Sequence, residues 1–386
     1  MGQDLVEISI NAIKLIVLFL IMVQAVPVLV WVERRGSAFI QNRLGPNRVG
    51  PLGLTQLLAD AVKFIMKEEF VPAKARATLF YMAPVVGLIP GALAFAALPL
   101  STPLEIGAFN LFDKTWGPYI LEFQGYHLGL GIVFVLGVSS LGAYALLMAG
   151  WGSSSKYSLL GALRASAQVI SYELAMGLAL VGVLILYNTF DFNVMVDAQK
   201  GPLTFMFFGE SMTIGFLPNW GIFYQPLGAL LFFAATFAET NRLPFDLPEA
   251  ESELVAGYHT EYGGMKMLMF YIGEYGHMLV ASALMSIFFF GGYNLPLISP
   301  EQLSSIFIEM GVATNWADVA VSLALFGFMT LKIALFMWIF IWVRWTLPRF
   351  RYDQLMSLGW KVMLPWALGN TVLTMIVVFI MRTNWS

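Results

Sequence analysis

The chain has 386 residues, of which 59% are hydrophobic and 12% are charged, whereas a soluble domain carries roughly 25% charged residues. This composition excludes an ordinary soluble globule, and the net charge of −3 excludes the strongly basic surface by which many proteins bind nucleic acid. Cysteine is absent, which excludes disulfides, thiolate zinc sites and iron–sulfur ligation by this chain. Electron carriers of that kind would therefore belong to partner subunits.

Stretches of about 20 apolar residues with at most one charge predict membrane-spanning helices. Eight stretches qualify, at 8–32, 79–100, 128–148, 165–187, 222–238, 278–297, 319–343 and 362–381, and residues 201–217 form a weaker ninth. With eight spans, alternate loops hold 16 Lys and Arg and the opposite side holds 3, whereas a ninth span gives 11 against 8. The positive-inside rule therefore favours an all-α polytopic membrane protein with eight transmembrane helices and both termini on the outer side.

The chain reads as a single membrane domain, 1–386, and four of its loops are predicted to face the cytoplasm: 33–78, 149–164, 239–277 and 344–361. In the first of these loops, residues 54–69 place Leu54, Leu58 and Ile65 at helical spacing, with Asp60 on the other side. This pattern predicts an interfacial amphipathic helix that lies along the membrane surface.

Three charged residues occupy unusual positions in or beside the apolar spans. Glu33 ends the first span beside Arg34, and arginines that reach for the interface explain Arg34 but not Glu33. Glu173 lies inside the fourth span, where an unpaired carboxylate costs several kcal/mol, so it is a candidate for ion or proton transfer. For Lys332 in the seventh span, proton transfer and a side chain that reaches an interface are equally good interpretations.

The loop that follows the fifth span is acidic, although cytoplasmic loops are usually basic. Residues 238–262 contain six acids, Glu239, Asp246, Glu249, Glu251, Glu253 and Glu261, against the single Arg242, and Glu274 follows. A solvated acidic face is the simplest interpretation, but interleaved apolar residues such as Phe245 favour a packed loop. Acids packed together raise one another's pKa values, which favours a role in proton handling.

The last cytoplasmic loop is basic and aromatic. Arg344, Arg349 and Arg351 could neutralise the acidic loop, bind lipid headgroups or dock a soluble partner. The chain has no HExxH motif and no glycine-rich phosphate loop that opens a helix. A self-sufficient enzyme is therefore not expected, and no metal site is predicted.

Three motifs resemble the H subunits of bacterial NADH:quinone oxidoreductase, respiratory complex I, a family equivalent to mitochondrial subunit 1. They are Glu33-Arg34 together with residues 42–51, residues 238–262, and residues 348–356. The resemblance extends over nearly the whole chain and implies membership of a proton-pumping translocase in the bacterial inner membrane. The partners would be the soluble quinone-site subunits, neighbouring membrane-arm subunits and lipid. Quinone would be the substrate, with NADH, FMN and iron–sulfur clusters in partner subunits and no cofactor bound by this chain alone.

The resemblance also implies roles for individual residues. The family's quinone tunnel and its entrance correspond to Glu33, Arg34, Arg43, Asp60, Arg242 and Phe245, with Arg344 and Arg349 nearby. The family's acidic connection into the membrane corresponds to Asp246, Glu249, Glu251 and Glu253, then Glu239, Glu173, Glu261 and Glu274. The chain departs from shorter family members at the outer-side loops 101–127 and 188–221, which could dock accessory subunits.

Two alternatives remain open on sequence grounds. An equivalent anchoring subunit of a membrane-bound hydrogenase or formate hydrogenlyase would keep the fold and change the electron donor. An autonomous proton-coupled transporter would belong to a different class, because it would be active alone, whereas a member of complex I should be inert outside its complex.

Overall fold

A computed structural model describes residues 2–106, 109–111, 114–116, 119–207, 210–246 and 256–383. The first half of the chain contains α1 (Gly2–Ile40), η1 (Pro51–Gly53), α2 (Gln56–Met66), α3 (Ala77–Ala96), β1 (Leu104–Ile106), β2 (Phe109–Leu111), β3 (Lys114–Trp116), β4 (Tyr119–Leu121), α4 (Gly131–Ser139), α5 (Leu141–Gly152) and α6 (Lys156–Tyr187). The second half contains α7 (Phe192–Ala198), β5 (Pro202–Phe207), β6 (Glu210–Pro218), α8 (Gly221–Tyr224), α9 (Pro226–Glu239), η2 (Gly257–Glu261), α11 (Gly264–Phe289), α12 (Pro300–Glu309), α13 (Thr314–Thr346), α14 (Tyr352–Ser357), η3 (Leu358–Met363) and α15 (Leu364–Thr383).

The fold is a helical bundle, as expected of an all-α polytopic membrane protein. Within the described ranges, seven helices are long and apolar enough to cross a membrane, with α4–α5 and α14–η3–α15 each counted as one helix. The predicted fifth span corresponds to the short α8 and the 14-residue α9, which are separated at Gln225. Each of the eight predicted stretches overlaps a helix or a helix pair of the bundle, but the fifth is too short to meet the same length criterion, so the count of eight transmembrane helices stays a prediction.

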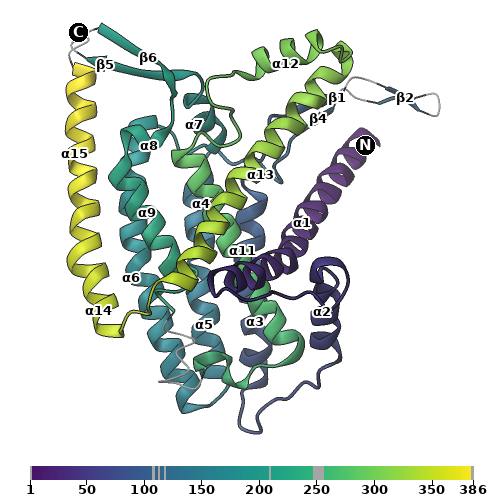
Figure 1. Cartoon of the computed structure of the whole chain (residues 1–386), viewed down its shortest axis with the longest axis vertical. Coiled ribbons are helices and arrows are strands. Elements are labelled where there is room, and N and C mark those ends of the chain that lie inside the picture. The colour runs from purple at the N-terminus through teal and green to yellow at the C-terminus, as the bar shows by residue number, and fades with distance from the viewer. Residues whose placement is uncertain are drawn as a thin grey trace.

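The bundle has two distinct ends (Figure 1). We call the end with α2, η2 and the 347–351 turn the site end, and the end with α12 and the β-hairpins the hairpin end. Both chain termini lie at the hairpin end (Figure 1). Helix α2 forms inside the predicted amphipathic range 54–69 and packs beside α1 and α11.

Helix α11 begins at Gly264, well before the predicted span at 278–297, and ends at Phe289. The hydropathy criterion misses its first half because Lys266, Glu274 and His277 interrupt the apolar pattern. The helix tolerates them because 83% of its most apolar window is buried within the protein, the largest share among the spans. Glu274 therefore lies inside a helix at the centre of the bundle and not in a loop.

The loops at the hairpin end contain short antiparallel hairpins that an all-α prediction does not include. Strand β1 pairs with β4, β2 with β3, and β5 with β6. The weak ninth span candidate at 201–217 is the β5–β6 hairpin, so it does not form a helix. In β6, apolar residues at 212, 214 and 216 alternate with polar or small ones, a pattern that suits a strand better than a membrane helix.

Glycines allow unusually close packing around α11 and η2. A Cβ atom at Gly273 would lie 2.7 Å from the backbone oxygen of Gly87, so α3 and α11 touch backbone to backbone. A Cβ atom at Gly161 of α6 would lie 2.7 Å from the Cα atom of Gly257 in η2. Larger residues cannot occupy such positions without moving the backbone. These contacts draw α3, α6, η2 and α11 together around the polar residues described next.

Candidate functional site

A buried ion cluster at the site end begins with Glu33 of α1. The Glu33 side chain is 9% exposed and accepts a 2.6 Å hydrogen bond from the Tyr275 hydroxyl of α11. Its other oxygen accepts a hydrogen bond from Arg344 near the end of α13. A buried carboxylate needs such charged and polar partners because desolvation alone would cost several kcal/mol. Glu33 is therefore not an interfacial anchor but the junction of three helices.

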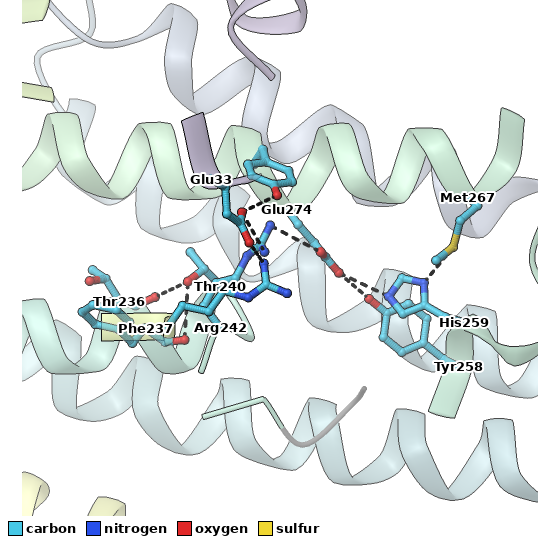
Figure 2. Close-up of polar contacts among 11 residues, drawn as sticks. Glu33, Thr236, Phe237, Thr240, Arg242, Tyr258, His259, Met267 and Glu274 are labelled. Atoms are coloured by element: carbon cyan, nitrogen blue, oxygen red, sulfur yellow. Dashed lines mark hydrogen bonds and ion pairs between the residues drawn. The ribbon is translucent and has the colours of Figure 1, made fainter. Parts of the chain in front are cut away.

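Arg242 connects this carboxylate to the next one. Its guanidinium lies 3.9 Å from Glu33 Oε2 and 3.9 Å from Glu274 Oε2 (Figure 2). It also lies 4.2 Å from the ring centroid of Tyr275. The side chain points inward because α9 ends at Glu239 and Asn241 takes a left-handed conformation, with φ of 50°. Asparagine tolerates that conformation better than most residues, which permits the sharp turn after the helix.

Glu274 continues the cluster toward η2. One of its oxygens accepts a 2.8 Å hydrogen bond from the Tyr258 hydroxyl and lies 3.3 Å from His259 Nε2 (Figure 2). The other oxygen faces Arg242. Glu33, Arg242, Glu274 and the Tyr258–His259 pair therefore form one continuous set of polar contacts inside the protein.

A small cavity adjoins this set on the side of the bundle core. Its volume is about 50 Å³, which accommodates a few water molecules at roughly 10–15 Å³ each. Residues from α3, α4, α5, α6, α9, η2 and α11 line it, and its polar lining includes Ser139, Glu239, Thr240, Asn241, Tyr258, Glu274 and His277. The cavity is thus a polar space between two carboxylates from different helices, Glu239 and Glu274.

Glu239 extends the polar path from the cavity to α6. It is the last residue of α9, it has a hydrogen-bonding contact with Ser139, and it is close enough to Glu173 for the two carboxylates to repel each other. Glu173 is half-buried in the middle of α6. The structure therefore brings together four of the predicted acids, Glu173, Glu239, Glu274 and Glu33, although they come from four helices.

Asp246 and Phe245 lie beside the cluster. Asp246 is buried and pairs with Arg349 across 3.1 Å. The Phe245 ring packs against the rings of Tyr172 and Phe350, at centroid distances of 5.3 and 5.5 Å. These contacts fasten the start of the acidic loop to α6 and to the 347–351 turn, as expected if the basic loop neutralises part of the acidic one.

The surface beside α2 holds an ion pair between two of the predicted tunnel residues. Arg34 of α1 and Asp60 of α2 are joined across 2.5 Å, with side chains 46% and 23% exposed. Arg43 is exposed, and its Nε donates a 2.6 Å hydrogen bond to Gln41, so it lies outside the buried cluster. The two predicted tunnel residues from α1 therefore separate, with Glu33 facing inward and Arg34 facing α2.

The structure says less about the remaining predicted acids, Glu261, Glu249, Glu251 and Glu253. Glu261 is the last residue of η2 and is partly exposed. Glu249, Glu251 and Glu253 lie outside the described residues. Among the described residues, no group of His, Cys, Asp and Glu side chains could hold a metal ion.

Four residues of the cluster are not predicted from sequence: Tyr258, His259, Tyr275 and His277. Their neighbours in sequence carry a usable signal, because Tyr275 adjoins Glu274 and His277 follows Glu274 by almost one helical turn. Treating the segment 264–277 as a helix would place His277 on the same face as Glu274.

The segments that meet at this cluster are shared with known proteins. A family model described as NADH dehydrogenase matches residues 13–375. A protein named as the H subunit of NADH-quinone oxidoreductase, from Bdellovibrio bacteriovorus, is 64% identical over 380 residues, or 98% of this chain and 99% of the relative. The chain belongs to the family of NADH-quinone oxidoreductase H subunits.

More distant H subunits also match over most of their length. The proteins from Cytophaga hutchinsonii and Geobacter metallireducens are 42% and 41% identical, over 89% and 95% of this chain and 89% and 96% of their own. The resemblance that the motifs at 33–51, 238–262 and 348–356 carry is thereby confirmed. Membership of this family agrees with a multi-pass membrane protein that acts as part of an oxidoreductase complex and is not catalytic alone.

Proposed function

We propose that this chain is the membrane subunit of a proton-pumping NADH:quinone oxidoreductase that forms the quinone tunnel and couples quinone reduction to proton translocation. The chain would cross the bacterial inner membrane eight times, with the short α8–α9 unit as the fifth crossing. The hairpin end and both termini would then face outward, and the site end would face the cytoplasm. The charge distribution supports this orientation, because most Lys and Arg belong to loops at the site end.

The observation that carries the proposal is a series of buried polar groups that runs through an apolar bundle and is interrupted by one small polar cavity. It leads from Glu33 through Arg242 to Glu274, and across the cavity to Glu239 and Glu173. Buried ionisable groups inside a membrane are costly, so a connected set of them whose members can exchange protons favours a role in ion or proton movement. The path lies where soluble subunits would bind, at the site end.

The region of α1, α2 and α11 suits an amphipathic ligand such as quinone. Exposed apolar side chains of α2, including Leu58, Ile65 and Met66, offer a surface for an isoprenoid tail. Beside them, the Arg34–Asp60 pair offers polar contacts for a passing headgroup. The tunnel would continue past Glu33 and Arg344 toward a headgroup site in the soluble subunits, which would also supply NADH, FMN and iron–sulfur clusters.

Coupling would begin with the charge balance of quinone reduction. A quinone that becomes a quinol takes up two electrons, delivered from NADH through partner subunits, and two protons. Proton uptake near Asp246 and Glu33 would change the charge next to Arg242, and Arg242 would transmit the change to Glu274 and Glu239. Neighbouring membrane-arm subunits would then carry out the pumping.

The Glu239→Gln variant, in the assembled complex, tests this function. Gln keeps the size and hydrogen bonding of the side chain but cannot exchange a proton, so we expect quinone reduction and proton pumping to fall together, by about tenfold or more. NADH oxidation by a water-soluble electron acceptor should be retained, because it reports only the soluble part of the complex. Glu301→Gln is the control, since Glu301 is an exposed carboxylate in α12 at the hairpin end. Normal coupled activity in the Glu239→Gln complex would refute the acidic connection.

A further inference from the structure

The polar path has a gap that direct contacts do not bridge. On one side, Glu274 is joined to Arg242, Tyr258 and His259. On the other side, Glu239 has a hydrogen-bonding contact with Ser139 and is close enough to Glu173 for the two carboxylates to repel each other. The cavity of about 50 Å³ lies between the two groups. A proton that moves between them must therefore cross this space by way of water or of another titratable side chain.

His277 is the one further titratable group, besides Glu239, Tyr258 and Glu274, among the described residues that line the cavity. It follows Glu274 by three positions on α11, so the two side chains lie on neighbouring parts of one helix face. The electrostatic interaction between His277 and Glu274 agrees with this proximity. The sequence pattern assigns no functional meaning to this histidine.

The surrounding helices leave room for its ring. A Cβ atom at Gly91 of α3 would lie 3.6 Å from the His277 backbone nitrogen, so α3 passes close to the backbone here. A Cβ atom at Gly142 of α5 would lie 3.8 Å from His277 Nε2, which places the ring edge against a residue without a side chain. The imidazole therefore occupies a slot between α3, α5 and α11 that opens into the cavity.

Imidazole chemistry suits such a gap. A neutral imidazole has one N–H donor and one acceptor nitrogen, so it can accept a proton at one nitrogen and release a proton from the other. Two carboxylates on opposite sides of a small space repel each other when both are charged, and an imidazolium cation between them relieves that repulsion. The titratable groups that line the cavity together with His277 are Glu274 on its own helix, Glu239 from α9 and Tyr258 from η2, and Arg242 pairs with Glu274.

We propose that His277 carries protons across the cavity between Glu274 and Glu239, with water completing the path. A proton arriving from Glu274 would bind one ring nitrogen, and the proton on the other nitrogen would leave toward Glu239. Reorientation of the ring or water within the cavity would then restore the starting state. This inference rests on the proposed function, since it adds a member to the acidic connection.

The test compares His277→Gln and His277→Ala in the assembled, membrane-embedded complex. Gln retains a hydrogen-bonding side chain but cannot titrate, so we expect coupled quinone reduction to fall about tenfold and its pH profile to lose one ionisation. His277→Ala should be equally slow, and added imidazole should restore its rate in proportion to the imidazole concentration. His127→Gln is the matched control, because His127 lies at the hairpin end, is 47% exposed and pairs with Asp191.

The outcomes separate this inference from the proposed function. If Glu239→Gln abolishes coupling while His277→Gln leaves the rate and pH profile unchanged, the acidic connection stands and the role of His277 is refuted. If His277→Gln slows the complex but leaves the pH profile intact, and imidazole does not rescue His277→Ala, the histidine has a packing role and the inference is also refuted. If Glu239→Gln itself is fully coupled, the proposed function fails first.

Discussion

Helix α11 meets two buried charges, its own Glu274 and Lys332 of α13 at its C-terminal end, but in different ways. At the site end, Glu274 faces Arg242, Tyr258 and His259 beside a cavity, so charge is shared among groups that can exchange protons. At the hairpin end, the Lys332 ammonium of α13 donates hydrogen bonds to the backbone oxygens of Phe290, Gly292 and Asn294, at 2.6, 2.7 and 3.0 Å. A cation favours such a position because unpaired carbonyls and the helix dipole meet at a helix C-terminus.

Gln199, a neutral side chain that bonds to the same end of α11, also contacts main-chain groups. Gln199 Nε2 donates to the backbone oxygen of Ile287, and its Oε1 accepts from the backbone nitrogens of Gly221 and Gly291. These partners are main-chain groups with fixed protonation. The difference teaches that a buried charge inside a membrane bundle is not by itself a sign of proton transfer; the chemistry of its partners decides. Lys332 is buried and caps the end of α11, so its interpretation as a side chain that reaches an interface is wrong, and proton transfer by Lys332 stays a prediction that the Lys332→Met variant below tests.

The Arg242→Met substitution should disrupt the ion cluster at the site end and have the largest effect on stability and activity. It removes the cation shared by Glu33 and Glu274, and loss of one partner from a buried ion pair costs about 3–5 kcal/mol. We expect a strong loss of thermal stability of the complex and no measurable quinone reduction. Arg351→Met is the matched control, since Arg351 is 73% exposed and pairs with the exposed Asp353. An Arg242→Met complex with normal stability and activity would show that the cluster is not held by this cation.

Lys332→Met should have an intermediate effect on stability, and it tests whether the two ends of the bundle differ in function. Met has a similar length and no charge, so the change leaves carbonyl oxygens at the end of α11 without donors, at about 1–3 kcal/mol for an unsatisfied buried group. We expect a lower thermal inactivation temperature but an unchanged rate of coupled quinone reduction and an unchanged pH profile at permissive temperature. Loss of one ionisation from that profile would place Lys332 in the proton path and erase the distinction between the two ends.

Much of the site can be predicted from sequence because the charges stand out against apolar surroundings. Glu33, Glu173, Glu239, Arg242 and Glu274 are all conspicuous without knowledge of their contacts. Their pairing cannot be predicted, because it depends on tertiary packing. Glu33 and Tyr275, for example, are 242 positions apart and meet only because α1 crosses α11.

The fold, like the site, can be predicted from sequence only in part. The bounds of α3 and of the α8–α9 unit are predicted to within four residues, whereas α1 runs eight residues past its predicted end and α6 begins nine residues before its predicted start. Helix α11 is shifted because its first half carries charges that face protein and not lipid. Hydropathy measures compatibility with lipid, so it underestimates helices at the centre of a bundle. His277 escapes prediction for the same reason, since the hydropathy pattern places the segment that contains it in a loop.

The smallest predicted effect concerns the support of the site end by Tyr262. Its ring stacks on Phe80 of α3 at a centroid distance of 4.2 Å, and its hydroxyl donates a 3.2 Å hydrogen bond to the Phe80 backbone oxygen, which holds η2 against α3. Burial raises the Tyr262 pKa above its usual value of 10. Tyr262→Phe should cost about 0.5–1.5 kcal/mol, the usual net value of one hydrogen bond.

The raised pKa also sets the sign of a pH dependence. Below pH 10 the hydroxyl is neutral in the folded and the unfolded chain, so its contribution is fully present; above pH 10 the unfolded chain ionises first, and stability falls with rising pH. The difference in thermal stability between the wild-type and Tyr262→Phe complexes should therefore be constant from about pH 7 to 9 and shrink or change sign toward about pH 11. A difference that grows with alkaline pH would mean that the anchored form is the phenolate, and η2 would then be held by charge, in the manner of the cluster beside it.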